Sequence, residues 1–209
     1  MKFRHTRRQK EFPPAYRLAP LLAVALLASL AGLGGAAQSV APPQVGIKNF
    51  GKVNDNYYRG SQPGAAQFAG LKGLGVRTVI DLRKDSLEEA PEQARGAGLQ
   101  YFNIPLTTKR PATAEQTEQF LKLVNDPANW PVYVHCKGGR HRTGQMTAIY
   151  RITQDGWTAR EAYEEMKRYD FEDSFFYPRS LKKHVFSYYE NFVTEKATGA
   201  AVPASGAAQ

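Results

Sequence analysis

The sequence predicts an α/β domain with a mainly parallel central sheet and helices on both faces. Two observations support this fold class. Short apolar, β-branched runs alternate along the chain with segments that carry helix-start signals. The 11 tyrosines and 11 phenylalanines supply bulky side chains for a core, and a domain of roughly 150 residues can bury about two-thirds of its unfolded surface.

Three segments have the composition of buried strands. Residues 77–82 form a β-branched run after a glycine-rich turn, and residues 99–104 form a second run that Pro105 is expected to end. The third run, residues 131–135, leads directly into the only cysteine of the chain. The parallel sheet is therefore expected to contain at least these three strands.

Helices are expected between and after these strands. Capping-box patterns, in which a Ser or Thr precedes a Glu or Gln by three residues, occur at 86–89, 113–116 and 158–161. Each predicts the start of a helix, and the first of these helices is expected to end near Gly96 and Gly98. Two further helices are predicted over about 143–155 and 180–194.

The N-terminal residues 1–37 are interpreted as a signal peptide. A basic stretch precedes a 16-residue apolar run, 18–33, and small residues at 35–37 offer a cleavage site near Ala37. The alternative is a retained anchor, but a spanning helix needs about 20 apolar residues. The chain is therefore expected to be exported to a periplasmic or extracellular space. Residues 38–50 are predicted to be a linker, 51–195 the folded domain, and 196–209 a disordered tail.

The positive charge of the chain is concentrated in this leader. Six basic residues and one acidic residue in 1–37 account for +5 of the formal charge of +9, which leaves +4 for the remainder. A mildly basic domain suits a small anionic substrate, and no nucleic-acid-binding motif accompanies the charge. Nucleic acid is therefore not expected as a partner.

Cys136 is the single cysteine, so it cannot form a disulfide within the chain. It ends the third predicted strand and is followed by Lys137, Gly138, Gly139, Arg140, His141, Arg142 and Thr143. A buried structural cysteine beside a glycine-rich turn does not explain why three cationic or titratable side chains crowd this turn. A bound anion does explain it.

Each part of the loop suits a phosphate group. The glycines permit a wrapped backbone whose N–H groups form an anion nest, and the following helix contributes its positive end. Arg142 can grip two phosphate oxygens with its planar guanidinium. The same positive surroundings favour the nucleophilic thiolate form of Cys136. Thr143 can donate its hydroxyl to the sulfur when the sulfur later becomes the leaving group.

The pattern His-Cys-x5-Arg-Thr-Gly resembles the signature of the cysteine-dependent protein tyrosine and dual-specificity phosphatase superfamily. Its context, Tyr58-Arg-Gly-Ser-Gln-Pro63 and Val79-Ile-Asp-Leu-Arg83, is similar to the atypical dual-specificity branch of plants, fungi and bacteria. The resemblance implies a phosphotyrosine-phosphatase-like fold, a phosphocysteine intermediate on Cys136, a phosphoryl group held by Arg142, and no metal or other cofactor.

One part of the family pattern is missing. Members commonly carry an aspartic acid, the proton donor to the leaving oxygen, in a loop that corresponds here to residues 105–111, which contain no acid. The segments that follow parallel strands gather at one edge of the sheet, so other acids can take this role. The candidates are Asp81, Asp85, Glu88, Glu115 and the acids from Asp170 to Asp173.

Substrate and activity remain open at this point. Lys137, Arg140 and His141, with Lys109 and Arg110 nearby, favour a multiply phosphorylated inositol, whereas ordinary loop charge leaves a phosphorylated protein as the substrate. Two rival functions are a rhodanese-like sulfurtransferase, which also uses a loop cysteine after a strand, and a phosphate-binding module that does not turn over.

Overall fold

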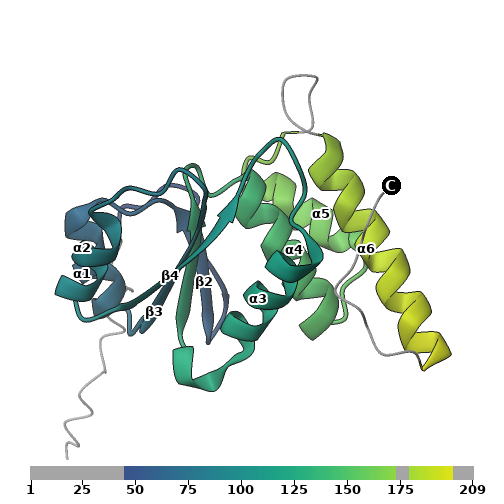
Figure 1. Cartoon of the computed structure of the whole chain (residues 1–209), viewed down its shortest axis with the longest axis horizontal. Helices are drawn as coiled ribbons and strands as arrows, with labels where there is room; N and C mark the ends of the chain where they lie inside the picture. Colours follow the sequence, from purple (N-terminus) through teal and green to yellow (C-terminus); the bar gives the residue numbers. More distant parts are fainter. Residues whose placement is uncertain (1–44, 173–178, 200–209) are drawn as a thin grey trace, which may run out of the picture. The chain divides into compact units, whose positions relative to one another are not determined.

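The computed structural model describes residues 45–172 and 179–199, which form an α/β fold as predicted (Figure 1). Within these residues the central sheet has five strands in the order β1-β2-β5-β3-β4. The β1–β2 pair is antiparallel, and the other three pairs are parallel. The strands are β1 (Gly51–Asn54), β2 (Tyr57–Ser61), β3 (Thr78–Arg83), β4 (Gln100–Leu106) and β5 (Val132–Cys136).

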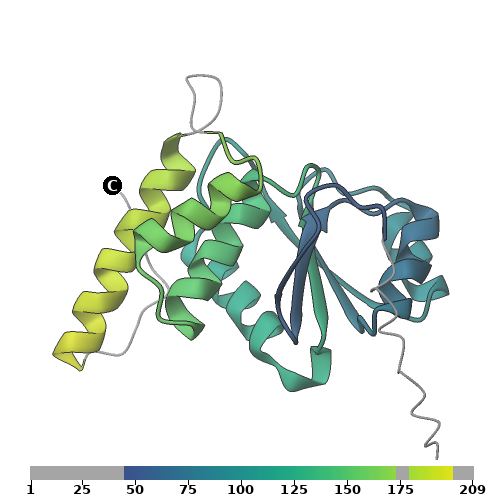
Figure 2. The same cartoon turned by 180° about the vertical axis from the view of Figure 1, so that it is seen from behind.

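Helices cover both faces of the sheet (Figures 1 and 2). On one face, α1 and α2 pack through residues such as Phe68 and Ala94 against Val79 and Tyr133 of the sheet. The other face is covered by α3 and α4, with α5 and α6 packed against α4. The helices are α1 (Ala65–Gly73), α2 (Ala90–Gly96), α3 (Ala114–Asn125), α4 (His141–Gln154), α5 (Ala159–Arg168) and α6 (Arg179–Thr198), with a 3-10 turn η1 (Pro127–Asn129).

The three predicted strands are confirmed as β3, β4 and β5, but the predicted end of β4 at Pro105 is wrong. β4 continues through this proline to Leu106. β4 is an edge strand of the sheet, and an edge strand tolerates a residue that has no N–H to donate. This extension matters for the site because Leu106 is one of the residues that hold Arg142.

Two of the three predicted capping boxes are confirmed. Thr113 caps α3 and Thr158 caps α5, each with the reciprocal bond from the residue three positions later. The box at 86–89 is wrong, because α2 begins only at Ala90 with a proline in its first turn. The Ser86 hydroxyl instead donates to Asp81 Oδ2 at 2.6 Å. The Ser86 hydroxyl, which the local pattern predicts to cap a helix, is thus bonded to the buried carboxylate of Asp81.

The boundaries of the domain also need correction. Residues 45–50 of the predicted linker are part of the fold, because Ile47 is buried and the carbonyl of Lys48 accepts a bond from Ser61 at the end of β2. The predicted tail from residue 196 begins inside α6, which continues to Thr198. The proposed signal peptide, residues 38–44 and residues 200–209 lie outside the described part of the chain. No helix in the described ranges is long and apolar enough to cross a membrane.

Candidate active site

Cys136 is the last residue of β5, which lies between β2 and β3 in the sheet. It is 3% exposed and packs in the core cluster that includes Met146 and Ile149 of α4. The loop 137–140 then turns the chain from β5 into α4, whose first residue is His141. The thiol therefore sits at the junction of a strand carboxyl end and a helix N-terminus, where anions are favoured.

Three successive carbonyls of the loop are bonded to groups outside it. The Lys137 carbonyl accepts from the Gln62 backbone N–H at 3.3 Å, and the Gly138 carbonyl accepts from Asn49 Nδ2 at 2.8 Å. The Gly139 carbonyl accepts from Arg59 Nη2 at 2.9 Å. These bonds turn the carbonyl oxygens of the loop toward surrounding segments, an arrangement that allows its N–H groups to form an anion nest.

Gly139 allows the loop to lie directly against the end of β2. Its φ is +67°, a conformation that glycine adopts without strain. A Cβ at this position would lie 2.5 Å from the carbonyl carbon of Gly60 and 2.6 Å from the nitrogen of Ser61. Backbone atoms cannot move aside as a flexible side chain can, so this position requires glycine.

Arg142 lies in the first turn of α4 and is 7% exposed. Its Nη1 donates to the carbonyl of Leu106 at 3.2 Å and to Asp85 Oδ1 at 3.3 Å. Its Nε has no hydrogen-bond partner among the described residues. The guanidinium is thus fixed on one side while a donor remains for an incoming oxygen.

Thr143 follows Arg142 and is fully buried. Its hydroxyl has no partner within residues 45–172 and 179–199. Gly144 follows on α4. A Cβ added there would lie 3.4 Å from the Met166 side chain, an ordinary van der Waals contact. Thr143 thus carries, in the first turn of α4 next to Arg142, a buried hydroxyl that no described residue engages.

A second polar cluster lies on the opposite face of the sheet. His135 is 1% exposed, and burial lowers its pKa to about 4, so the ring is neutral at pH 7. Its Nδ1 lies 3.8 Å from Asp81 Oδ1. Asp81 accepts bonds from the Ser86 hydroxyl, the Tyr101 hydroxyl at 2.7 Å and the Arg83 backbone N–H at 2.9 Å. Asp81 is therefore a structural acid: it is buried on the face of the sheet opposite Cys136, and its carboxylate is fully bonded within the protein.

The remaining candidate acids occupy different positions. Asp85, with 65% of its side chain exposed, is the one whose carboxylate contacts Arg142. Glu172 lies 3.6 Å from Arg140 of the loop. The other candidates are exposed: Glu88 before α2, Glu115 in the first turn of α3, and Asp170 after α5. Asp173 lies outside the described residues.

Three of the side chains that were expected to bind phosphate differ in exposure. Lys137 is exposed, and Arg140 is half-buried beside Glu172. His141 is buried, with its ring centroid 5.2 Å from that of Phe171 in an edge-on arrangement. Burial, with Arg140 as the next cause, lowers the pKa of His141.

Sequence reasoning missed the residues that hold the loop from outside. Asn49 belongs to the segment predicted to be a linker, and Arg59 appears in the sequence analysis only as part of a motif.

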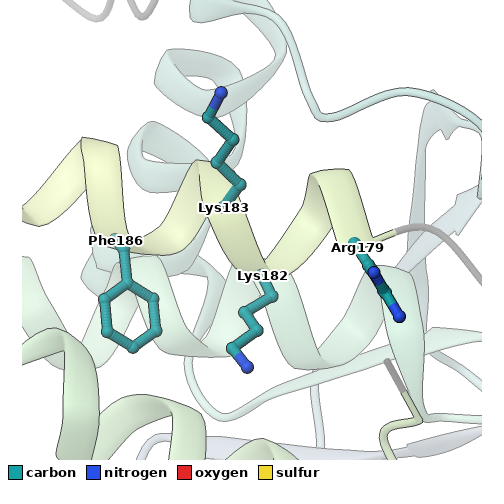
Figure 3. Close-up of a pocket in the computed structure, with 4 residues that line it drawn as sticks. All are labelled: Arg179, Lys182, Lys183 and Phe186. Carbon is teal, nitrogen blue, oxygen red and sulfur yellow. The ribbon is translucent and has the colours of Figure 1, made fainter. Parts of the chain in front are cut away.

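A hollow of about 450 Å³ lies along α6, lined by Arg179, Lys182, Lys183 and Phe186 (Figure 3). None of these four residues belongs to the loop 137–140, and we treat this hollow as separate from the site around Cys136.

Comparisons with known proteins agree with this geometry. Residues 42–181 match the family model described as "DSP-PTPase phosphatase fused to NAD+ Kinase". The dual specificity protein phosphatase TpbA of Pseudomonas aeruginosa is 33% identical over 129 residues, which are 60% of this chain and 56% of TpbA. The crystal structure of TpbA superimposes with a TM-score of 0.59 and 30% identity, covering 69% of this chain and 87% of that one.

Two eukaryotic relatives extend the comparison. The putative tyrosine-protein phosphatase OCA1 of Mycosarcoma maydis is 34% identical over 139 residues, which cover 62% of this chain and 82% of OCA1. The inositol diphosphatase DSP2 of Oryza sativa is 31% identical over 141 residues, with 64% of this chain and 66% of that protein covered. The family match, the shared fold and the loop around Cys136 coincide, and the chain belongs to the DSP-PTPase family of phosphatases.

Proposed function

We propose that the chain hydrolyses phosphomonoesters through a phosphocysteine intermediate on Cys136. The observation that supports this most is the loop that follows Cys136: three of its carbonyls bond to groups outside it, and the Nε of Arg142 has no partner among the described residues. Such a cradle stabilises the charge on the phosphoryl oxygens where it develops in the transition state.

The two chemical steps follow from the positions of these groups. The Cys136 thiolate attacks phosphorus, the bond from phosphorus to the leaving oxygen breaks, and that oxygen takes a proton. Water then attacks the phosphocysteine, the sulfur–phosphorus bond breaks, and its electron pair returns to sulfur, where we assign the Thr143 hydroxyl to stabilise it. Inorganic phosphate leaves, and the thiolate is restored.

The rival functions explain less of the site. A sulfurtransferase does not require an arginine held so that a planar fork meets two oxygens of a tetrahedral anion. A binding module does not require a nucleophile directly beneath that anion. Membership of a phosphatase family adds to the case for hydrolysis.

The first prediction concerns the nucleophile. Cys136→Ser should lower kcat on an aryl phosphate by at least about four orders of magnitude, because a hydroxyl is a far weaker nucleophile than a thiolate at pH 7. The variant should still bind phosphate, since the loop is unchanged. Phosphate release and isothermal titration measure the two effects. If Cys136→Ser retained more than a few per cent of the rate, the covalent mechanism would be wrong, and thiosulfate–cyanide turnover by the wild type would favour the sulfurtransferase.

We further propose Asp85 as the proton donor to the leaving oxygen. Desolvation raises the pKa of its carboxyl, but hydrogen bonding to the backbone, to Arg142 and to Arg83 outweighs this and lowers the pKa overall. A phosphate dianion that binds Arg142 brings negative charge next to the carboxylate, and a like charge raises the pKa of an acid. Substrate binding therefore favours protonation of Asp85 in the complex that needs the proton.

The second prediction uses the leaving group to separate catalysis from structure. Asp85→Asn should lower kcat about a hundredfold on an alkyl phosphate, whose leaving oxygen needs a proton. It should change kcat by less than about threefold on p-nitrophenyl phosphate, whose phenolate leaves unaided. The matched control is Glu115→Gln, an exposed acid outside the site. Equal losses on both substrates would show that Asp85 holds Arg142 in place and does not donate the proton.

For the substrate we propose a multiply phosphorylated inositol. Exposed Lys137 lies in the loop, and exposed Lys109 and Arg110 follow β4, the strand whose end holds Arg142. Additional phosphates on one ring can meet these cations at the rim of the site. The relation to an inositol diphosphatase supports this assignment, whereas the relation to dual specificity and tyrosine phosphatases supports a phosphoprotein.

The third prediction tests this choice. Inositol polyphosphates should exceed phosphotyrosine peptides in kcat/KM, because each charge-assisted hydrogen bond to a further phosphate contributes about 1.5–3 kcal/mol. A Lys109→Ala, Arg110→Ala double variant should lose most of this preference and keep its rate on p-nitrophenyl phosphate. The preference should also weaken as salt is added. A wild-type enzyme that prefers the peptide would overturn the inositol proposal.

Export is the last element of the proposal. The basic and apolar pattern of residues 1–37 supports a signal peptide cleaved near Ala37. The fourth prediction is that protein recovered from the envelope fraction of a bacterial host has a mass that begins close to Gln38. The intact mass from Met1 in the soluble cytoplasm would contradict export, and the intact mass in the membrane fraction would favour an anchor.

A further inference from the structure

Arg59 is a buried cation on the strand next to Cys136. It is 0% exposed and pairs in register with Val134 of β5, while Ser61, two residues later, pairs with Cys136. Alternate residues of a strand face the same side of a sheet. Arg59 and Cys136 therefore share the face that α4 covers, one pleat apart on neighbouring strands.

The contacts of Arg59 with described residues hold its guanidinium in place but include no negatively charged side chain. Nη2 donates to the Gly139 carbonyl at 2.9 Å, and the Tyr169 ring lies over the guanidinium at 3.9 Å. A Cβ at Gly51 would collide with the Tyr169 hydroxyl, so this ring is seated closely against β1. Among the described residues, Nε and Nη1 have no acceptor and no carboxylate pairs with Arg59.

Arg151 shows how the same fold treats an arginine with a purely structural role. Its side chain is 12% exposed and lies 4.3 Å from the Trp157 ring, much as Arg59 lies on Tyr169. It differs in having two carboxylates, Glu165 at 2.7 Å and Asp155 at 2.6 Å. An uncompensated buried charge is costly, so the missing partner at Arg59 calls for a functional explanation.

The negative groups around Arg59 leave one candidate for its counter-charge. Burial lowers the pKa of Arg59, and the charges that oppose this effect are those of Tyr57, Glu165, Tyr169 and Cys136. Glu165 is already paired with Arg151. Tyr57 keeps its proton, because burial raises its pKa further above neutral pH. Tyr169 meets the guanidinium with the face of its ring rather than with an anionic group. A Cys136 thiolate is thus the anion that can balance Arg59, and a stabilising effect between two charges is mutual.

We propose that Arg59 is a positioning residue that stabilises the Cys136 thiolate from beneath the loop and orients the Gly139 carbonyl away from the bound phosphate. This role rests on the proposed thiolate mechanism and adds to it a residue outside the loop. The other titratable and charged groups around this end of the sheet are Arg142 and His141 on α4, His135 and Tyr133 on β5, Arg83 on β3, and Asp85 after β3.

The fifth prediction follows the thiolate directly. Cys136 is the only cysteine, so alkylation by iodoacetamide, read by mass, reports on one thiol and needs no phosphatase turnover. Rates measured from pH 5 to pH 10 should show that Arg59→Met slows alkylation at pH 6 by at least about tenfold, the effect of moving the titration by one unit. The rates should converge near pH 10, where every variant is ionised. Arg59→Lys, which keeps the charge, should stay within about threefold of wild type at pH 6.

The controls separate this role from packing and from the proposed function. Arg151→Met removes a comparable arginine and should leave the alkylation profile unchanged even where it lowers Tm. Should Arg59→Met fail to fold, Tyr169→Leu admits water to the guanidinium and should slow alkylation at pH 6 about threefold. An unchanged profile in a folded Arg59→Met, or an equal shift in Arg151→Met, would overturn the proposal. A wild-type profile centred near that of free cysteine, about 8.5, would instead overturn the thiolate mechanism itself.

Discussion

The contact of Gly139 with the end of β2 is the constraint on which the site depends. The loop reaches this contact because Gly139 has a φ of +67° and no side chain. Its backbone can therefore pack directly against the backbone of Gly60 and Ser61. There Arg59 can reach the Gly139 carbonyl. The groups that bond the loop carbonyls, from Asn49, Arg59 and Gln62, are more than 70 residues away in the sequence. The shape of the anion nest is therefore a property of the assembled sheet rather than of the loop sequence.

The parts of the site that sequence predicted are those with a local cause. Cys136 at a strand end and Arg142 in the first helical turn follow from a short, distinctive pattern, and the caps at Thr113 and Thr158 need only residues three positions away. The failures have tertiary causes. Ser86 had the right spacing for a cap, but buried Asp81 took its hydroxyl. The role of Asn49 could not be predicted, because its partner Gly138 lies 89 residues later.

Asp81 and Asp85 show why the proton donor could not be chosen from sequence. Both follow the same apolar run, and both lie near the carboxyl end of β3. The alternation of the strand turns Asp81 to the face covered by α1 and α2, where hydroxyl and amide groups saturate it. Two residues past the strand, Asp85 returns to the loop side and meets Arg142. A difference of four residues thus separates a buried acid behind β3 from an exposed acid that contacts Arg142.

The charges of the site are arranged in two layers that act at different stages. In the proposed mechanism Arg142 and the exposed lysines bind the arriving phosphate, and Asp85, which accepts a bond from Arg142, holds it until then. Arg59 is fully buried under the Tyr169 ring, and in our proposal it acts on the thiol before any substrate is present. A buried cation with no carboxylate lowers stability, which proteins commonly accept where function requires it. A carboxylate beside Arg59, like those beside Arg151, would stabilise the fold but would remove the field that favours the thiolate. In the proposed mechanism, the thiolate of Cys136 therefore depends on Arg59 having no acidic partner.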